Sequence, residues 1–387
     1  MTKILLIGAS LSGNFGGPSL LSSTVKVLKK FIPKARFTLL SPVPADSKLS
    51  KTYGIKVVSH TQKNGMPWFL SGAISDLNKY EDADIIIDIW GIGLGEGPKL
   101  LLASKLLNKP VIKYTADMGP FKAKRDRLTA KIYLNNIDLI LARNETTKKH
   151  LLELGVTTPI HVCPDTAFIL EPTPSKTSKT LSKERLKKRT IAGISMSHIA
   201  ERKGHSNGKY VTTMAKTADY LIQKLNALVV LIPNEIFPKK YDDLDVAKRI
   251  FTKINDKTKV MLLKKECLAS ELKGIIGECD LLIGARYHSI VAAISMPVPT
   301  LAISWHHKYH EVMKLMSQEE YICDIKSLNF TELQEKIDKL WENREKIKAE
   351  LASRMPFIKE SVLSGGKIVK ELLNAKKRQR KFSLTTP

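Results

Sequence analysis

The sequence is poor in cysteine and in aromatic residues, and it contains no long apolar run. Four cysteines in 387 residues form no CxxC pair and no Cys/His metal spacing, which excludes a disulfide scaffold and indicates reduced, buried thiols. Aromatic residues make up 6%, and no RNP-like or zinc-finger pattern is present, so a domain that reads nucleic-acid sequence is not expected. The longest stretch without Asp, Glu, Lys or Arg, between Arg286 and Lys308, contains histidines and prolines, which disfavours a membrane span.

The N-terminus begins with a short apolar run, Lys3–Ile7. No small-residue cleavage site follows a long apolar region there, so the run is typical of a buried first strand rather than of a signal peptide. Together with the reduced thiols, this pattern predicts a cytoplasmic protein.

Basic residues strongly outnumber acidic ones. With 63 Lys and Arg against 38 Asp and Glu, the formal charge is +25. Such an excess suits nucleic acid, an anionic membrane or a small anionic substrate, and charge alone does not choose among them. Two basic runs, Lys176–Arg189 and Lys376–Lys381, are typical of a solvated linker and a solvated tail. We expect the tail to be disordered and dispensable for folding.

Short β-branched runs alternate with longer amphipathic segments, which is the rhythm of parallel sheets covered by helices. The predicted strands are 3–7, 36–40, 55–59, 84–89, 111–114, 138–141 and 160–163 in the first half, and 190–195, 228–232, 259–263, 281–283 and 298–303 in the second half. The sequence therefore predicts an α/β fold of two doubly wound Rossmann-like domains with a cleft between them.

Composition also predicts where these domains end. The stretch Glu171–Ser178 is rich in proline and hydroxyl residues and lacks apolar periodicity, as linkers do. We expect an N-terminal domain over 1–170, a linker over 171–189, a C-terminal domain over 190–354, a helix over 355–375 that returns to the first domain after a break at Met355-Pro356, and a basic tail over 376–387.

Three glycine-rich loops follow predicted strands of the N-terminal domain, at the sheet edge where open parallel sheets bind ligands. The first, Gly8–Pro18, matches neither the dinucleotide-binding nor the P-loop fingerprint, so a plain tight turn explains it equally well. The second, Asp88–Pro98, has glycines alternating with other residues, which favours a loop close to a substrate. The third, Thr115–Phe121, fits a Gly-Pro turn nearly as well as a site.

The sharpest chemical signal lies in the second half, where an apolar strand ends in Gly-Ala and Arg286 and His288 follow. In an extended segment, residues two apart lie on the same side. The guanidinium of Arg286 suits a carboxylate or phosphate, and the imidazole of His288 transfers protons near neutral pH. A helix start beside Ser289 adds free N–H groups that favour an anion. Either residue alone would more often be a surface ion pair or a packed histidine.

Six short segments together resemble the polysaccharide pyruvyl transferase family. They are Gly13-Asn14-Phe15-Gly16-Gly17, the loop Gly91–Gly97, Met118-Gly119-Pro120-Phe121, Ala142-Arg143-Asn144-Glu145, Cys163-Pro164-Asp165-Thr166-Ala167-Phe168 and Ile283-Gly284-Ala285-Arg286-Tyr287-His288. No single segment is specific, but their order and spacing agree with the family over roughly residues 3–310. The resemblance implies a fold like the B-type glycosyltransferases and transfer of pyruvate from phosphoenolpyruvate to sugar hydroxyls as a ketal.

The resemblance also implies roles for individual residues. His288 is the expected general acid, with Arg286 and Asp117 as further catalytic residues. The donor is expected at Arg286, Ser289, His306, His307 and Arg202, and the acceptor at Asn14, Gly16, Gly17, Asp88, Trp90, Gly93 and Gly95. This chemistry requires no metal and no cofactor, and phosphoenolpyruvate acts as a co-substrate.

Two positions depart from the family pattern. Gly17 stands where an acid is usual, which puts a carboxylate contact from this loop to the acceptor in question. Ser197 stands where many members have arginine, and Arg202, Lys203 or His205 is the expected replacement.

Other functions stay open at this point. A B-type glycosyltransferase with a nucleotide-sugar donor would use the same Arg286 and helix start. A protein that binds nucleic acid or an anionic surface through its charge would lose affinity steeply as salt rises. Because a bidentate fork cannot be replaced by an ammonium, we expect Arg286→Lys to weaken donor binding with hardly any change in stability.

The expected partners follow from the resemblance to the pyruvyl transferases. They are phosphoenolpyruvate and a cell-surface saccharide or its lipid-linked precursor, with no specific nucleic acid. Peripheral association with an anionic membrane and formation of a homo-oligomer also stay open.

Overall fold

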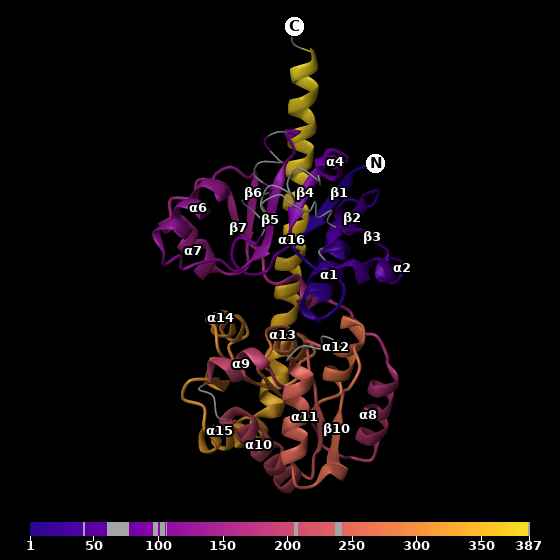
Figure 1. Cartoon of the computed structure of the whole chain (residues 1–387), viewed down its shortest axis with the longest axis vertical. Helices are drawn as coiled ribbons and strands as arrows, with labels where there is room; N and C mark the ends of the chain where they lie inside the picture. The colour runs from indigo at the N-terminus through magenta and orange to yellow at the C-terminus, as the bar shows by residue number, and fades with distance from the viewer. Residues whose placement is uncertain are drawn as a thin grey trace, which may run out of the picture. The chain divides into compact units, whose positions relative to one another are not determined.

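The computed structural model describes residues 1–41, 43–59, 77–95, 100, 105, 107–204, 208–236 and 242–385, which form two compact units (Figure 1). Unit 1 consists of Met1–Ser12, Leu20–Thr166 and Ile358–Pro387, and unit 2 of Gly13–Ser19 and Ala167–Phe357. This division differs from the predicted boundaries in a way that matters for the site, because the glycine segment after the first strand groups with unit 2.

Unit 1 is built on a seven-stranded parallel sheet with the strand order β3-β2-β1-β4-β5-β6-β7. The strands of this sheet are β1 (Lys3–Ile7), β2 (Arg36–Ser41), β3 (Lys56–Ser59), β4 (Ile85–Asp88), β5 (Val111–Ala116), β6 (Leu139–Ala142) and β7 (Ile160–Val162). β1 and β6 are apolar and almost wholly buried, as strands covered on both faces must be.

Helices cover both faces of this sheet (Figure 1). The helical segments of unit 1 are α1 (Gly16–Phe31), α2 (Ser50–Tyr53), α4 (Leu77–Glu81), α6 (Lys124–Leu134), α7 (Glu145–Glu153), the second part of α16 (Arg344–Thr385) and the 3-10 turn η1 (Pro44–Leu49). The 3-10 turn η2 (Thr166–Ile169) leads from unit 1 into unit 2. Successive residues of β1 point to opposite faces. Ile4 and Leu6 pack with α1 and α16, whereas Leu5 and Ile7 pack with α6 and α7.

Unit 2 has a six-stranded parallel sheet with the strand order β10-β9-β8-β11-β12-β13. Its strands are β8 (Ile191–Ser195), β9 (Leu228–Leu231), β10 (Val260–Leu262), β11 (Leu281–Gly284), β12 (Thr300–Ser304) and β13 (Ile322–Asp324). The helical segments are α8 (Lys176–Leu186), α9 (His198–Lys203), α10 (Lys209–Leu225), α11 (Asp243–Lys253), α12 (Ala269–Gly277), α13 (Tyr287–Ser295), α14 (Lys308–Leu315), α15 (Phe330–Glu342), the start of α16, η3 (Lys257–Lys259) and η4 (Glu319–Tyr321).

The predicted α/β architecture is confirmed, because each predicted strand is present within two residues of its expected bounds. β13 was not predicted, since Ile-Cys-Asp is too short to show a strand pattern. No helix of the described residues combines the length and the apolar content that crossing a bilayer requires.

A helix, α8, stands where the linker was predicted. Ser175 begins it with a capping box, because the Ser175 side chain accepts from the Ser178 N–H and the Ser178 side chain accepts from the Ser175 N–H. Leu181 is fully buried in the core of unit 2, and Arg185 pairs with Asp280. The interpretation of this run as a linker is therefore wrong, since one buried leucine and a serine cap are enough to dock a short helix. Most of its basic side chains are exposed, as expected.

The C-terminal region is more continuous than predicted. α15 ends at Glu342, and α16 then runs from Arg344 to Thr385 with Pro356 inside it. The predicted break at Met355-Pro356 is therefore wrong, and the chain breaks its helical path at Asn343 instead.

The end of α16 makes contacts that the prediction of a disordered tail did not include. Lys376 pairs with Asp138 at 2.7 Å, and Lys377 donates to Thr2 at 3.3 Å. The prediction of disorder is therefore wrong for these two lysines. Lys376 and Asp138 are both partly exposed, and such a pair contributes at most about 1 kcal/mol.

We expect truncation after Leu373 to lower the melting temperature by no more than a few degrees. The reason is that the truncated protein keeps Val369 and Leu373, which are buried in the core of unit 1. Truncation after Phe357 removes both and is expected to unfold unit 1. Differential scanning fluorimetry of the two truncated proteins distinguishes these outcomes, and a large loss in the first would contradict this account.

Both sheets reverse their strand order at a central strand. In unit 1, β1 lies between β2 and β4, and in unit 2, β8 lies between β9 and β11. Chain connections leave such a point toward opposite faces, and the carboxyl ends of the strands there form the usual ligand site of open α/β sheets. The loops after β1 and β4, and those after β8 and β11, are therefore the places where a site is expected.

Candidate active site

The carboxyl end of β11 in unit 2 carries a buried charge cluster around Arg286. The guanidinium binds Asp243 through two parallel hydrogen bonds, Nε to Oδ2 at 2.8 Å and Nη2 to Oδ1 at 2.5 Å. Nη2 also lies 2.7 Å from Glu235 Oε2 and 3.0 Å from His198 Nδ1. Arg286 is 8% exposed and Asp243 is fully buried. The planar fork that the sequence suggested for the donor is thus occupied by Asp243.

Asp243 connects three strand ends through one carboxylate. It accepts hydrogen bonds from the backbone N–H of His198 after β8, at 2.9 Å, and from those of Asn234 and Glu235 after β9, at 3.1 and 3.0 Å. Burial alone would raise the pKa of Asp243, but the hydrogen bond from His198 and the charge of Arg286 outweigh it and hold that pKa below its ordinary value. The carboxylate is therefore ionised and fixes the loops after β8, β9 and β11 together.

The same side chains have the composition of a metal site. The ligand atoms of His198, Glu235 and Asp243 lie within 4.8 Å of one another. Nη2 of Arg286 is within hydrogen-bonding distance of all three side chains and so fills the space between them. A cation would have to displace Arg286, and the cluster therefore stabilises a guanidinium instead.

Ser289, in the first turn of α13, belongs to a second buried cluster. Its hydroxyl donates to Asn234 Oδ1 at 2.8 Å and accepts from Ser195 Oγ at 2.9 Å, and Asn234 Nδ2 donates to Ser195 at 2.9 Å. All three residues are buried. The Ser289 hydroxyl is thus used inside the protein, which leaves the N–H groups at the start of α13 as the expected contact with the donor.

His288 packs against the glycine segment that follows β1. A β-carbon added to Gly16 would lie 2.5 Å from His288 Nδ1 and 2.8 Å from its Cε1, so the imidazole lies directly on the backbone of Gly16. The segment is held there because the N–H of Phe15 donates to the carbonyl of Asn234 at 3.2 Å. Two segments that resemble the family, far apart in sequence, therefore meet at His288.

Asn14 and Gly17 form the start of α1. The side chain of Asn14 accepts from the N–H of Gly17 at 2.8 Å, and its backbone forms an isolated antiparallel bridge with Glu235. Asn14, Gly16 and Gly17, which were expected to contact the acceptor, thus group with the residues expected at the donor.

Gly16→Ala tests the packing of His288. The added methyl group would overlap the imidazole, so the ring has to move. If His288 transfers a proton, as the sequence predicts, we expect at least ~10-fold loss of turnover because the displaced ring is no longer positioned for it, with little change in the melting temperature. Steady-state kinetics and thermal unfolding of the variant check this. Normal turnover in Gly16→Ala would show that the position of His288 is unimportant.

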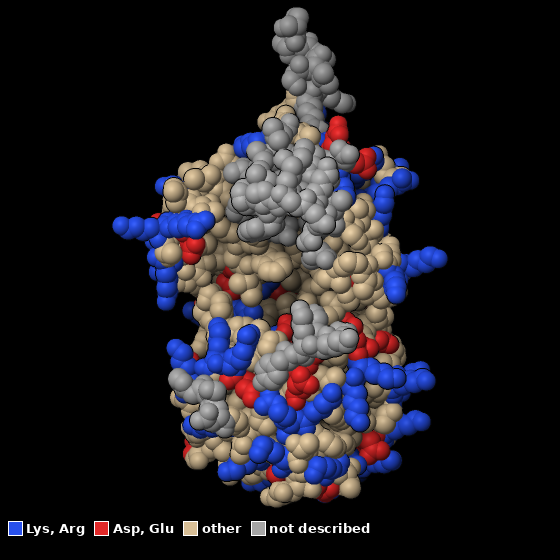
Figure 2. All heavy atoms as spheres, in the orientation of Figure 1, with Lys and Arg blue, Asp and Glu red and all other residues tan. Residues whose placement is uncertain are grey.

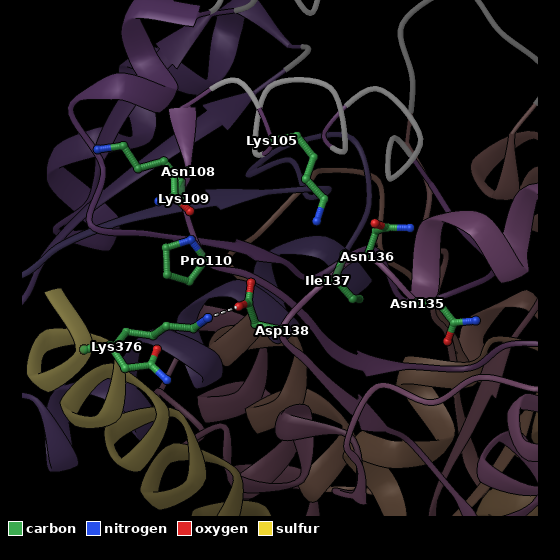
Figure 3. Close-up of a pocket in the computed structure, with 10 residues that line it drawn as sticks. Lys105, Asn108, Lys109, Pro110, Asn135, Asn136, Ile137, Asp138 and Lys376 are labelled. Atoms are coloured by element: carbon green, nitrogen blue, oxygen red, sulfur yellow. Dashed lines mark ion pairs between the residues drawn. The ribbon is translucent and has the colours of Figure 1, made fainter. Parts of the chain in front are cut away.

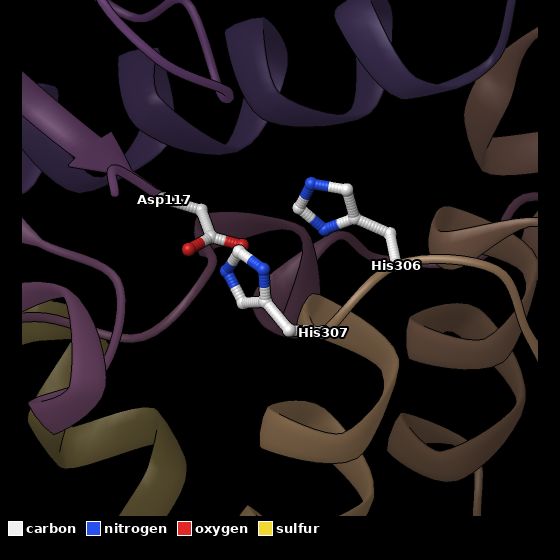
Figure 4. Close-up of side chains that lie close together, drawn as sticks. All are labelled: Asp117, His306 and His307. Carbon is white, nitrogen blue, oxygen red and sulfur yellow. The ribbon is translucent and has the colours of Figure 1, made fainter. Parts of the chain in front are cut away.

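The loop after β12 is fixed to the loop after β11 by two aromatic residues. Trp305 Nε1 and Tyr309 OH each donate to the carbonyl of Ala285 at 2.9 Å. His306 and His307 follow Trp305, and their ring centroids are 4.2 Å apart (Figure 4). Both histidines that were predicted at the donor therefore lie next to the strand end of β11.

Two lysines lie near the same loop. The ammonium of Lys308 is 5.3 Å from the ring of Tyr287 and 5.0 Å from that of Trp305. The ammonium of Lys203 is 4.7 Å from the ring of Trp305 and donates to the carbonyl of the same residue at 3.4 Å. Lys308 was not singled out from the sequence, because a lysine at a helix start carries no signal of the aromatic rings that surround it.

The region after β8 departs from the family pattern at Ser197, which caps α9 by accepting from the N–H of Ala200. Among the expected replacements for the family arginine, Lys203 contacts Trp305 and Arg202 is exposed on α9. Among the described residues, Arg202 takes no part in the hydrogen bonds and ion pairs of the cluster around Arg286. His205 lies outside the described residues.

In unit 1, the carboxyl end of β4 holds a second buried ion pair. Lys113 Nζ lies 2.8 Å from Asp88 Oδ2, and neither side chain has exposed surface. Burial lowers the pKa of Lys113, and the charge of Asp88 opposes this effect. Asp88 also accepts from the N–H of Trp90 at 2.9 Å. Through these two buried contacts, Asp88 fixes the start of the loop that follows β4.

Trp90 begins the glycine loop and is 46% exposed. Gly95 has a φ of +57°, and a β-carbon there would lie 2.6 Å from the indole. Gly93 has a φ of +64° and donates its N–H to the carbonyl of Asp117 at 2.8 Å. The glycines thus let the loop fold closely beside Trp90 while much of the indole stays exposed. Gly97 lies outside the described residues.

Asp117 follows β5 and is buried, with 2% of its surface exposed (Figure 4). Its side chain accepts from Thr147 Oγ1 at 3.0 Å, and its N–H donates to the carbonyl of Gly91 at 3.1 Å. Asp117 therefore joins the loop after β4 to the loop after β5.

Two further family-like segments meet in unit 1. Arg143 after β6 pairs with Asp165 at 3.2 Å, and both side chains are buried. Asn144 caps α7 by accepting from the N–H of Thr147 at 2.7 Å. These segments therefore shape the carboxyl edge of the sheet.

A hollow of about 440 Å³ lies at the opposite edge of the same unit (Figure 3). Its lining includes Pro110 and Asp138, which directly precede β5 and β6, and Lys376, which pairs with Asp138. The hollow thus lies at the amino ends of these strands, whereas open parallel sheets bind substrates at the carboxyl ends. We do not assign it to the active site.

Residues 14–307 match the family described as polysaccharide pyruvyl transferase. The chain belongs to the polysaccharide pyruvyl transferase family. Among its relatives, the amylovoran biosynthesis protein AmsJ of Erwinia amylovora is 23% identical over 420 residues, which cover 96% of this chain and 99% of AmsJ. The family resemblance stated from the sequence is therefore confirmed, and it indicates a transferase of polysaccharide biosynthesis.

Two solved structures share the fold of this pyruvyl transferase family member. Anabaena HepE, in complex with UDP and glucose, has a TM-score of 0.66 at 16% identity and covers 97% of this chain and 100% of its own. A UDP-N-acetylglucosamine 2-epimerase from Listeria monocytogenes, described as putative, has a TM-score of 0.65 at 13% identity, with 90% of both chains covered. At these identities the likeness shows the fold alone, and it confirms the architecture of the B-type glycosyltransferases.

In this family member, Asp243 and His198 are further residues around Arg286 that were not apparent from the sequence. Asp243 follows Asp242, and acidic residues at a helix start usually cap the helix, as Asp242 does for α11. Nothing local distinguishes the capping aspartate from the one that reaches Arg286. Only the strand order, which brings the ends of β8, β9 and β11 together, makes the pairing apparent.

Proposed function

We propose that the protein transfers pyruvate from phosphoenolpyruvate to hydroxyls of a cell-surface saccharide, or of its lipid-linked precursor, as a ketal. Membership of the family and similarity to a polysaccharide biosynthesis protein support this proposal. The observation that carries it is the packing of His288 on Gly16, because it brings a proton-transferring side chain, a glycine segment and a helix start together.

The reaction joins two hydroxyl groups to one carbon. First, an acceptor oxygen bonds to the central carbon of phosphoenolpyruvate while His288 gives a proton to the methylene carbon, which becomes a methyl group. The proton released by that hydroxyl restores His288. A second hydroxyl then bonds to the same carbon, the bond to the phosphate oxygen breaks, and inorganic phosphate leaves with the remaining proton. Acid–base help of this kind contributes ~10²–10⁴-fold to the rate.

Donor binding uses the two anionic groups of phosphoenolpyruvate. Because Asp243 takes the Nε and Nη2 edge of Arg286, we assign Nη1 to one anionic oxygen. The N–H groups at the start of α13 suit the other group, as do His306 and His307 on the neighbouring loop. Arg202 stays a proposed contact for the donor. Arg286 thus both binds the donor and holds the loop that carries His288.

Acceptor binding is assigned to Trp90, whose exposed indole offers a flat apolar face to a sugar ring. Gly93 and Gly95 let the loop fold closely beside this indole. Asp117 is the proposed base for the second acceptor hydroxyl and passes its proton to the leaving phosphate. Asp88 is closer in sequence to Trp90. Asp88 is excluded from this role because its carboxylate is fully buried against Lys113.

A glycosyltransferase with a nucleotide-sugar donor is the second candidate. Anabaena HepE, solved with UDP and glucose, shares the fold. A diphosphate would also suit the start of α13. Fold and anion chemistry therefore leave this candidate in place.

Calorimetry on the purified protein separates the two candidates. If phosphoenolpyruvate is the donor, we expect a saturable heat with phosphoenolpyruvate and none with UDP-glucose. Binding should weaken at high salt, because salt screens the attraction between an anionic donor and the basic residues of the protein. Saturable binding of UDP-glucose without binding of phosphoenolpyruvate would replace the proposal by the second candidate.

A further inference from the structure

One face of α6 in unit 1 exposes two large apolar side chains. Leu128 is 62% exposed and Ile132 is 50% exposed. They are four residues apart, so their side chains are neighbours on the same face of the helix. Tyr133 and Leu134 are buried in the core of unit 1, which shows that α6 packs on the sheet by its other side. The apolar pair therefore faces away from the core.

Basic residues surround this pair. Lys124 and Arg125 lie four and three positions before Leu128, and Lys131 lies three positions after it, which places all three on the same face. The three side chains are exposed, and within the part of the chain that the structure describes none of them has an ion pair. Lysine and arginine side chains project from the region of α6 and α7 in the space-filling view (Figure 2).

We propose that the α6 surface, formed by Lys124, Arg125, Leu128, Lys131 and Ile132, docks on an anionic lipid bilayer. An apolar centre inside a ring of cations fits such a surface, because the apolar side chains enter the headgroup region while the cations bind lipid phosphates. Nucleic acid would be bound by the cations but would leave the apolar pair without a function. Charge complementarity together with the apolar centre therefore selects the bilayer.

Docking through α6 differs from anchoring by the basic tail. The biological reason to hold the enzyme at a bilayer rests on the proposed function, since a lipid-linked saccharide would be presented there. The binding itself requires neither phosphoenolpyruvate nor a saccharide. Binding to vesicles and transfer of pyruvate can therefore fail independently of each other.

Co-sedimentation of the full chain with vesicles tests the surface. We expect binding to vesicles of phosphatidylcholine mixed with phosphatidylglycerol, little binding to phosphatidylcholine alone, and weaker binding as salt rises. Leu128→Ser with Ile132→Ser should lower the affinity by at least ~10-fold. Lys124→Gln, Arg125→Gln and Lys131→Gln together should lower it by about 10²-fold, because each cation near an anionic surface contributes about five-fold.

Leu186→Ser is the matched control. Leu186 is 84% exposed at the end of α8, and the neighbouring Arg185 and Lys187 are paired with acids. This variant should bind vesicles like the unmodified protein. All variants change exposed side chains, so unchanged thermal unfolding confirms that they are folded.

Several results would overturn the proposal. They are an unmodified protein that does not bind the anionic vesicles, α6 variants that bind them normally, and loss of binding on truncation after Leu373 alone. The unmodified protein could instead form an oligomer and not bind vesicles. If Leu128→Ser with Ile132→Ser dissociates that oligomer, the surface binds a second copy of the chain. RNA binding that depends only on the cations, without vesicle binding, would assign it to nucleic acid.

Discussion

Replacement of His288 by alanine is expected to lower the turnover of pyruvyl transfer by ~10²-fold or more. The imidazole of His288, in the first turn of α13, lies on the backbone of Gly16. In the proposed function it protonates a donor bound by the N–H groups of the same helix start. The lost interaction belongs to the transition state, so the affinity for phosphoenolpyruvate should fall much less than the turnover. Steady-state kinetics with separate binding measurements check this split.

His310→Ala provides the matched control, because His310 is exposed on α14. Its turnover should equal that of the unmodified protein. The melting temperature of His288→Ala should change by only a few degrees, since a half-buried side chain is removed. A strongly destabilised His288→Ala variant whose folded fraction has normal kinetics would mean that His288 is only a packed histidine.

Asp243→Ala is expected to lower the free energy of unfolding by about 3–5 kcal/mol, because it leaves a buried guanidinium without its partner. Arg286→Lys should destabilise as well, since an ammonium cannot form both bonds to the carboxylate of Asp243. The expectation that Arg286→Lys hardly changes stability therefore no longer holds. Denaturant unfolding of the two variants measures the effect.

The bidentate pair of Arg249 with Glu201 is the matched control. Its arginine is 42% exposed, so Arg249→Lys should cost less than about 1 kcal/mol. Equal losses in Arg249→Lys and Arg286→Lys would contradict the argument that burial makes the Asp243 pair important.

The Asp243 pair also predicts a dependence on pH. The pKa of Asp243 is lower in the folded protein than its ordinary value of 3.8. Its carboxylate therefore contributes stability that is present above the unfolded pKa and is lost as the pH falls through the folded one. Asp243→Asn should be less stable near neutral pH and should lose less further stability on acidification, which acid titrations of the unfolding free energy can measure.

The fold could be predicted because its signal is local. Strands such as β1 and β6 are continuous apolar runs, and the connections between them have helical periodicity. α8 was not predicted because Leu181 is its one buried apolar residue, which gives no helical periodicity. The continuation of α16 through Pro356 was not predicted either, since a proline inside a helix normally indicates a break.

The site could be predicted only in part. Arg286 and His288 were apparent from their place after an apolar strand, and the structure puts both beside the start of α13. The partner of Arg286 was not apparent, because Asp243 lies far away in sequence and looks like a helix cap. For the same reason Asp88 was assigned to the acceptor, although it is buried against Lys113. Pairings of this kind depend on which strand ends are neighbours.

The central claim is that phosphoenolpyruvate is the donor. Its most direct test is transfer of label from phosphoenolpyruvate, carbon-labelled in the pyruvyl group, to a membrane and polysaccharide extract from the organism that encodes the chain. We predict that the unmodified protein incorporates label into saccharide and releases inorganic phosphate in equal amounts, and that His288→Ala does both ~10²-fold more slowly. No incorporation from phosphoenolpyruvate, together with release of UDP from a UDP-sugar in the same extract, would contradict the account.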